Sequence, residues 1–171
     1  MDDATFWAII ESGGKRALSD PDRQLASVRK RLAKLPPEQI REFHRHVWRK
    51  LADAHSWDLW GAAYLINGGC SDDGFLYFCA WLVSRGRAVY EAAVANPDSL
   101  AGLTDTDRDD YEFEDLLSVA FDAYEDATSE EMVKLDLPWP KKPRGRRWDF
   151  DDDDKVARRL PELANIYFAD R

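Results

Sequence analysis

The chain has 171 residues, a length that fits one domain, which would bury roughly 70% of the surface exposed by the unfolded chain. Its formal net charge of −9 at pH 7 argues against a protein that tracks nucleic-acid phosphates with its whole surface, so nucleic acid is not the expected partner. The two cysteines are too few for a disulfide scaffold or a thiolate zinc cage.

The N-terminal segment, MDDATFWAII, carries acids where a secretory signal would carry lysine or arginine. No apolar run approaches the ~20 residues that a membrane-spanning helix needs. We therefore expect a cytoplasmic protein with no membrane partner. Residues 5–12 are predicted to form the first helix, which ends at Gly13 and Gly14 because glycine tolerates the left-handed turn that closes a helix.

Two further helices are predicted before residue 55. Asp20 and Pro21 supply a cap and a first-turn proline, and apolar residues then recur at helical spacing as far as Leu35. Pro36 and Pro37 end that helix and begin the next, which has an apolar stripe opposite a charged face. We expect these two helices to form an antiparallel hairpin.

Residues 57–66 are apolar on nearly all sides, which predicts the central and most buried helix of the fold. An Asn-Gly-Gly turn at residues 67–69 ends it. Ser71 is a favourable N-cap for the next helix, which should run to about Ser84 and stop at Gly86. These two helices are expected to form the central hairpin.

The middle of the chain continues the helical pattern. A helix that starts near residue 87 should end at Asn96, because the residue before a proline is driven out of the helical region. Residues 98–110 are predicted to be a polar, acidic loop. Residues 113–124 carry apolar side chains at helical spacing and predict one more amphipathic helix.

The C-terminal part has a different composition. Residues 137–147 hold three prolines and no periodicity, so they should lie extended over the domain or remain mobile, with Trp139 and Trp148 pinning the ends. Basic residues here are followed at once by aspartates, which predicts a solvated, self-neutralising linker. Residues 156–168 can form a terminal helix or helix pair, with Pro161 in a first turn.

These elements predict an all-α fold with a single compact domain of about seven helices. We expect residues 1–135 to be the helical domain, residues 136–150 a Pro/Arg-rich linker, and residues 151–171 a C-terminal helix that packs back on the domain. The chain has no alternating strand pattern of five or more residues and no internal repeat.

One long segment is similar to a known family. The run WDLWGAAYLINGGCSDDGFLYFCAWLVSRGR, followed by NPDSL, resembles the signature of the bacterial domain-of-unknown-function family 4240. An FW pair near the N-terminus and PPEQIREF before the third helix add to the likeness, which covers about residues 3 to 130. The resemblance implies an all-helical fold and a soluble bacterial protein, and it implies no particular activity or catalytic residue.

Two adjacent aspartates, Asp72 and Asp73, open the helix after the glycine turn. Paired carboxylates can bind a cation or perform acid/base work, but their spacing lacks the pattern of a calcium loop. An N-terminal position also favours carboxylates through the helix dipole, and this structural role explains both residues. We favour the structural role and keep the site as the alternative.

A cysteine or histidine enzyme is not favoured. Cys70 lies next to a helix N-terminus, which lowers a thiol pKa, while the neighbouring carboxylates act in the opposite direction. His44, His46 and His55 all lie on one helix or at its end, where their spacing forms no zinc site. We therefore name no catalytic residue, no metal ligand and no cofactor.

The aromatic residues of the segment allow two interpretations. Trp57, Trp60 and Tyr64 share a helix face, which is first of all the pattern of a buried core face and alternatively that of a ligand-stacking wall. Near the end of the following helix, Arg85 could add a cation that pairs with Asp58 or Asp72.

The most favoured function is a non-covalent binding or regulatory module with a groove around residues 57–87. A basic protein partner or a small polar ligand fits the acidic composition, and the oligomeric state is open. The alternative is a metal-assisted hydrolase that uses Asp72 and Asp73. The candidate ligand-binding residues are Asp58, Trp60, Asn67, Asp72, Asp73 and Arg85.

Overall fold

The computed structural model describes residues 1–14, 20–107 and 110–169, and these residues form an all-α fold without a strand. Ten helical elements are present among them, against about seven predicted. The elements are α1 (Asp3–Ile10), α3 (Pro21–Leu32), α4 (Pro37–Ala54), α5 (Trp57–Ile66), α6 (Asp72–Ser84), α7 (Arg87–Ala95), the 3-10 helix η1 (Pro97–Gly102), α8 (Asp115–Thr128), α9 (Asp153–Arg159) and α10 (Pro161–Tyr167).

The predicted helix starts follow from side-chain caps. The Asp20 carboxylate accepts a hydrogen bond from the Arg23 amide, and Pro21 fills the first turn of α3. Ser71 caps α6 by accepting from the Gly74 amide at 3.1 Å. The acidic loop expected at residues 98–110 instead begins with η1, because Pro97 presets a helical φ and Asn96 caps the Asp98 amide.

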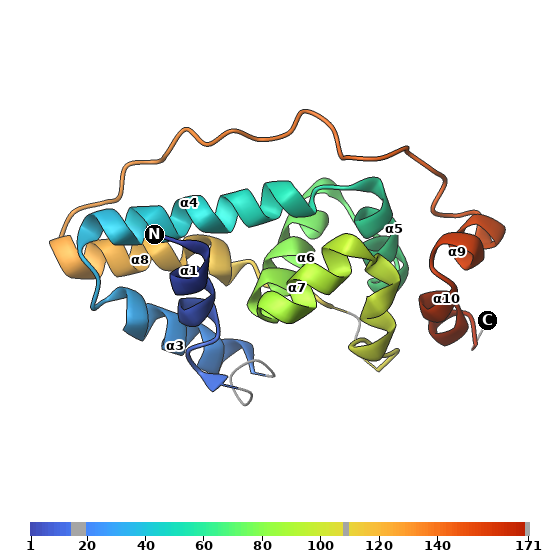
Figure 1. Ribbon diagram of the computed structural model, residues 1–171, viewed down its shortest axis with the longest axis horizontal. Helices are drawn as coiled ribbons and strands as arrows, with labels where there is room; N and C mark the ends of the chain where they lie inside the picture. The colour runs from blue at the N-terminus through green and yellow to red at the C-terminus, as the bar shows by residue number, and fades with distance from the viewer. Residues whose placement is uncertain (15–19, 108–109, 170–171) are drawn as a thin grey trace.

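The helices form two neighbouring groups (Figure 1). At one end, α4 and α8 lie side by side along the long axis, with α3 packed on α8 and α1 on both α3 and α4. α3 and α4 pack on α8 rather than chiefly on each other, so the predicted hairpin of these two helices is wrong. At the other end, α5 and α7 pack on η1, α10 packs on η1, α5 and α9, and α6 joins the two groups through its contacts with α4, α7 and α8.

The most continuous buried stretch is the second half of α6 rather than α5. Every residue from Phe78 to Ser84 is buried, and Trp81 is among the largest fully buried side chains. The buried Gln24 amide donates to the Ser84 carbonyl and, at 3.4 Å, to the Ile10 carbonyl, and so ties α3 to α6 and α1. α6 therefore occupies the centre that the sequence pattern assigned to α5.

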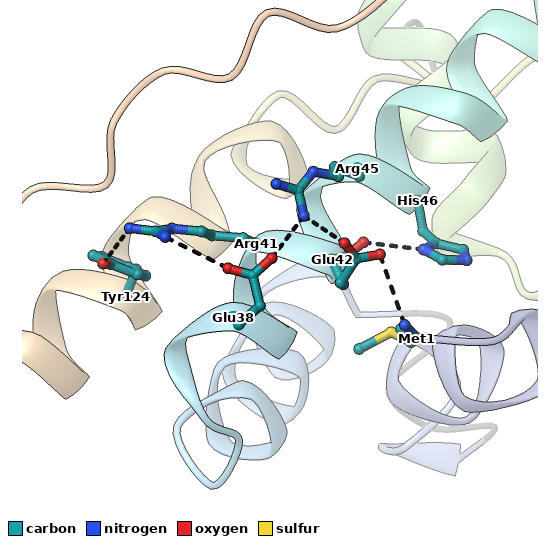
Figure 2. Close-up of polar contacts among 7 residues, drawn as sticks. All are labelled: Met1, Glu38, Arg41, Glu42, Arg45, His46 and Tyr124. Carbon is teal, nitrogen blue, oxygen red and sulfur yellow. Dashed lines mark hydrogen bonds and ion pairs between the residues drawn. The ribbon is translucent and has the colours of Figure 1, made fainter.

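A polar network joins α4 to its neighbours (Figure 2). The Arg45 guanidinium bridges the carboxylates of Glu38, at 2.9 Å, and Glu42. Arg41 donates to the Tyr124 hydroxyl of α8 at 2.6 Å and lies over the same ring, 4.8 Å from its centroid. The network therefore links α4 to α8 through Arg41 and to the N-terminus through the ion pair of Glu42 with the Met1 amine at 3.7 Å.

Residues 129–152, which we call the strap, connect α8 to α9 without regular structure and cross the α4 side of the molecule (Figure 1). Trp139 packs against Trp48 and His55, with ring centroids 5.7 and 5.1 Å away. The Arg144 amide donates to the His55 carbonyl at 2.8 Å, and the Arg144 carbonyl accepts from the Trp57 amide at 3.0 Å. These contacts hold the strap at the start of α5.

The C-terminal helix pair is attached through a buried carboxylate. Asp98 of η1 accepts hydrogen bonds from the amides of Glu162 and Leu163, at 3.1 and 3.0 Å, and so caps α10 from another part of the chain. α10 also packs against α5 and α9. Among the described residues, no helix combines the length and apolarity needed to cross a membrane.

Candidate functional site

A cavity of about 1130 Å³ separates α5 from the C-terminal part of the chain. One wall is formed by α5 with the start of α6, and the other by residues 146–151 with α9. The two walls are brought together by the strap contacts at Arg144 and Trp148. Side chains remote in the sequence therefore face one another across this space.

The first wall is a column of stacked rings. Trp57 and Trp60 stack with centroids 5.5 Å apart and planes at 17°, and Trp60 stacks on Phe75 at 4.6 Å and 6°. The Trp60 indole nitrogen donates to the Cys70 carbonyl at 3.1 Å. Because Trp60 is held by rings and by this hydrogen bond, the column has a fixed orientation, and Trp57 is its outermost ring.

This aromatic face is only in part the buried core face that the sequence pattern favoured, because Trp57 and Trp60 pack against the core cluster on one side. Trp57, Trp60 and Tyr64 are each half-buried and line the cavity. The opposite side of α5, with Leu59 and Ala62, supplies the core contacts. α5 is apolar all round because it has two partners, the core on one side and the strap and α9 across the cavity on the other.

The second wall is held in place by Asp58. Its carboxylate accepts from the Trp148 indole nitrogen at 3.0 Å and from the Arg159 guanidinium at 2.6 Å. Arg159 also lies over the Trp148 ring, 5.3 Å from its centroid, and Trp148 meets Phe150 edge-on at 4.7 Å. One carboxylate thus orients a tryptophan and an arginine at the cavity.

Gly61 makes the close approach of this wall possible. A Cβ at this position would lie 2.2 Å from Cζ2 of Trp148, well inside van der Waals contact. Trp148 therefore packs directly on the backbone of α5. At the far end of the cavity, the Tyr64 hydroxyl donates to Asp151 at 2.8 Å, and this hydrogen bond raises the pKa of Tyr64, as does the charge of Asp151.

The cavity has more positive than negative groups, although the whole chain is acidic. Five cations line it, against the three carboxylates Asp72, Asp149 and Asp151. The cations are Arg146, Arg147, Lys155, Arg158 and Arg159. Since the chain carries a formal charge of −9, the cation-rich lining of this cavity is a local exception, although two of its cations, Lys155 and Arg159, form ion pairs with Asp152 and Asp58.

The sequence model of a family described as protein of unknown function (DUF4240) matches residues 1–126. The chain belongs to the DUF4240 family. No curated protein and no solved structure gives a match to the chain. The part matched to DUF4240 contains the aromatic wall and ends before the residues of the second wall.

Within the DUF4240 region, the structure brings some of the predicted site residues together. Trp60 and Asp72 line the cavity, and Asp58 of α5 accepts the hydrogen bond that orients Trp148 of the second wall. Asp73 is exposed in the first turn of α6. Asn67 ends α5, where its side-chain oxygen accepts from the Tyr111 amide at 3.2 Å.

Arg85 is placed apart from that group. It follows the last residue of α6 while Asp72 is the first, so about 20 Å of helix separates them. The Arg85 guanidinium donates to the side chains of Gln24 and Ser84. Asp58 has Arg159 as its cationic partner instead, so the structure does not bring Arg85 into the groove.

Cys70 lines the cavity, but its surroundings do not activate it. Burial, followed by the charges of Glu112 and Asp72, raises the pKa of the Cys70 thiol to about 12. The effect of these groups outweighs that of the helix N-terminus considered from the sequence. Among the described residues, no group of three or more His, Cys, Asp and Glu side chains is arranged to hold a metal ion.

The histidines take part in packing. Burial lowers the pKa of His44 to about 4, and its ring meets Phe121 edge-on at 4.8 Å. His46 bonds the Glu42 carbonyl at 3.0 Å. His55 lies among aromatic rings that include Phe75 and Trp139.

Sequence reasoning missed the whole second wall. Trp148 was expected only to pin the end of a linker, and the neighbouring arginines only to be neutralised by aspartates. The available signal was the placement of Trp148 and Phe150 within the run RRWDFDDDDK, where a solvated linker has no need of two large aromatic residues.

Proposed function

We propose that this protein is a non-covalent binding module whose ligand enters the cavity between α5 and the C-terminal part of the chain. The observation that carries the proposal is the cavity itself, which combines a fixed column of aromatic rings with a cation-rich opposite wall. Binding sites typically combine apolar and aromatic surface with a few oriented polar groups.

A small ligand is favoured over a basic protein partner at this site. The acidic composition of the chain supports a basic partner, but the cavity lining carries more cations than carboxylates. A basic peptide segment would meet Arg146, Arg147 and Arg158 at close range, with an electrostatic cost. A small ligand with an aromatic ring matches the column formed by Trp57 and Trp60.

The experiment is a ligand-observed and protein-observed NMR screen with a library of small aromatic acids and neutral aromatic compounds. We expect aromatic compounds to shift the indole N–H signals of Trp57, Trp60 and Trp148, which meet the cavity. The signals of Trp7 and Trp81, buried in the core, are the internal control. A library that leaves all three cavity signals unshifted contradicts the proposal.

A metal-assisted hydrolase that uses Asp72 and Asp73 is the second candidate, and the observation in its favour is that Asp72 reaches the cavity. Mg²⁺ can bind through one or two carboxylates, with water and substrate completing its ligands. Thermal melts of the parent, Asp72→Asn and Asp73→Asn with and without MgCl₂ test it. A metal-dependent rise in the parent that both variants lose supports this candidate, whereas equal melts with and without metal remove it.

A further inference from the structure

The outer ring of the aromatic column, Trp57, meets the Phe150 ring at 6.3 Å and an arginine side chain. The Arg147 guanidinium lies over Trp57, 5.2 Å from its ring centroid, on the side of the cavity. Arg147 is exposed, and no carboxylate of a described residue lies within ion-pair distance of it. A planar heteroaromatic ring could stack on Trp57 in its place, and Arg147 would then be released toward the same ligand.

The other cations of the cavity divide into two that form ion pairs and two that do not. Lys155 and Arg159 form ion pairs with Asp152 and Asp58, at 2.7 and 2.6 Å. Arg146 and Arg158 line the cavity, and within the described parts of the chain no carboxylate lies within ion-pair distance of either. Guanidinium groups match phosphate oxygens in a two-point geometry, so three such arginines suit a phosphate group.

Two of the lining carboxylates indicate which groups the ligand would carry between its aromatic ring and its phosphate. Asp72 and Asp149 can accept hydrogen bonds but cannot donate them when ionised, so they suit ligand hydroxyl or amino groups. A simple aryl phosphate offers neither group. A sugar offers the hydroxyl groups, and a base with an exocyclic amine offers the amino group. The cavity volume of about 1130 Å³ exceeds the roughly 300–1,000 Å³ of common small-molecule sites, so the cavity has room for both parts.

We propose that the cavity binds a free nucleoside phosphate, with its base on Trp57 and its phosphate among Arg146, Arg147 and Arg158. The inference rests on the binding function proposed above and names its ligand class. A free nucleotide is favoured over a nucleotide within a nucleic-acid strand, because the formal charge of −9 opposes a long polyanion that extends beyond the cavity.

The test is isothermal titration calorimetry on the full chain. The probes are the 5′-monophosphates of adenosine, guanosine, cytidine and uridine, the four unphosphorylated nucleosides, inorganic phosphate and the tetranucleotide r(ACGU). We expect at least one monophosphate to bind with a Kd below about 1 mM. Its nucleoside and phosphate alone should each bind about tenfold more weakly or worse, since each lacks half of the contacts.

Matched variants separate the two halves of the site. Trp57→Leu removes the stacking surface, and Arg158→Gln removes an exposed cation, so each should weaken binding of that monophosphate about tenfold. Arg31→Gln, an exposed arginine on α3 outside the cavity, should leave the Kd unchanged. Circular dichroism establishes that each variant is folded, and Arg158→Gln keeps the test decisive if Trp57→Leu does not fold.

Several results would overturn the inference. They are the absence of any monophosphate with a Kd below about 1 mM, equal binding of nucleosides and monophosphates, or a tetranucleotide that binds more tightly than every monophosphate. Unchanged affinity in Arg158→Gln would do the same. If aromatic compounds shift the Trp57 indole signal while no monophosphate binds, the ligand class is wrong and the binding function stands.

Discussion

At the scale of single residues, the surroundings of His44 displace its pKa out of the usual range of a histidine. It is buried on α4 against Phe121, and burial, with a contribution from the charge of Arg45, lowers its pKa from 6.5 to about 4. Below pH 6.5 the unfolded chain gains a proton at this site that the folded chain does not. The neutral His44 side chain therefore makes its full contribution to the free energy of unfolding above pH 6.5, and this contribution is lost as the pH falls toward 4.

Urea unfolding at pH 7 and pH 5 measures this effect. We expect the free energy of unfolding to fall by about 2 kcal/mol between the two pH values from His44 alone. His44→Phe keeps an aromatic ring at the site and should remove most of that difference. The residual slope should have the same sign, because burial also lowers the pKa of His55. An equal pH dependence in parent and variant would contradict the assignment.

Cys70 should be chemically inert in spite of its place in the cavity wall. With its pKa raised from 9.0 to about 12 by burial and nearby carboxylates, the thiolate fraction at pH 8 is about a thousandfold lower than that of an ordinary thiol. Alkylation by iodoacetamide at pH 8, followed by mass spectrometry, should label Cys70 only after the chain is unfolded in urea. Labelling of the folded chain within minutes would show an activated cysteine and favour a covalent function.

At the scale of elements, the packing of Trp148 on Gly61 fixes the strap against α5. Gly61→Ala places a methyl group 2.2 Å from the Trp148 ring, so the ring must move, at a cost of about 1–3 kcal/mol from overpacking. Without Trp148 the same change should instead stabilise α5 by about 0.5–1 kcal/mol, because alanine is the better helix former.

A double-mutant cycle measures this coupling. Free energies of unfolding of the parent, Gly61→Ala, Trp148→Ala and the double variant should give an interaction energy of at least about 1 kcal/mol. Gly102→Ala in η1 is the control, because a Cβ there meets no atom within 4 Å. Additive effects of Gly61→Ala and Trp148→Ala would mean that the strap does not pack on α5 in solution.

The same pair shows what a sequence can predict. Periodicity and caps identified the long helices and the all-α fold, because both signals are local: Asp20 and Ser71 lie within four residues of the amides that they cap. The burial of Trp148 depends on a glycine far away in the chain and on Asp58 as its hydrogen-bond acceptor. No spacing encodes such a contact.

α5 shows why only part of the candidate site could be predicted from the sequence. An all-apolar helix indicates two apolar neighbours, and the sequence pattern does not distinguish a core neighbour from a cavity wall. Its aromatic face became a cavity wall because the strap, which has no periodicity, brings Trp148 and Phe150 to face it. Asp58, Trp60 and Asp72 could be found from the sequence because they lie on or beside α5, whereas the second wall could not.

At the scale of the whole molecule, one wall of the cavity lies within the region that matches DUF4240 and the other lies outside it. The DUF4240 match covers residues 1–126, and therefore the aromatic column, while all five cations of the lining lie between residues 146 and 159. On the function proposed above, the family region supplies the stacking surface and the C-terminal part selects for an anion. Ligand preference would then depend on how firmly the strap is held.

Hydrogen exchange across the full chain measures how firmly the strap is attached. The amides from Phe78 to Ser84 lie in the buried half of α6 and should exchange most slowly, because only large unfolding events expose them. Between residues 131 and 143, no amide donates a hydrogen bond to a described residue, so this stretch should exchange fastest. Arg144 should be an exception within the strap, since its amide bonds the His55 carbonyl at 2.8 Å.

We therefore expect the strap to be mobile along residues 131–143 and to be attached to the helices at Arg144 and Trp148. Gly61→Ala, which displaces Trp148, should raise exchange at the Arg144 and Trp57 amides while leaving the α6 amides unchanged. A bound ligand should act in the opposite direction, because it contacts both walls and favours the closed arrangement. If Arg144 exchanges as fast as Val133 in the parent, the strap is not anchored and the cavity has no lasting second wall. Protection of residues 131–143 equal to that of α6 would instead show that the strap belongs to the core.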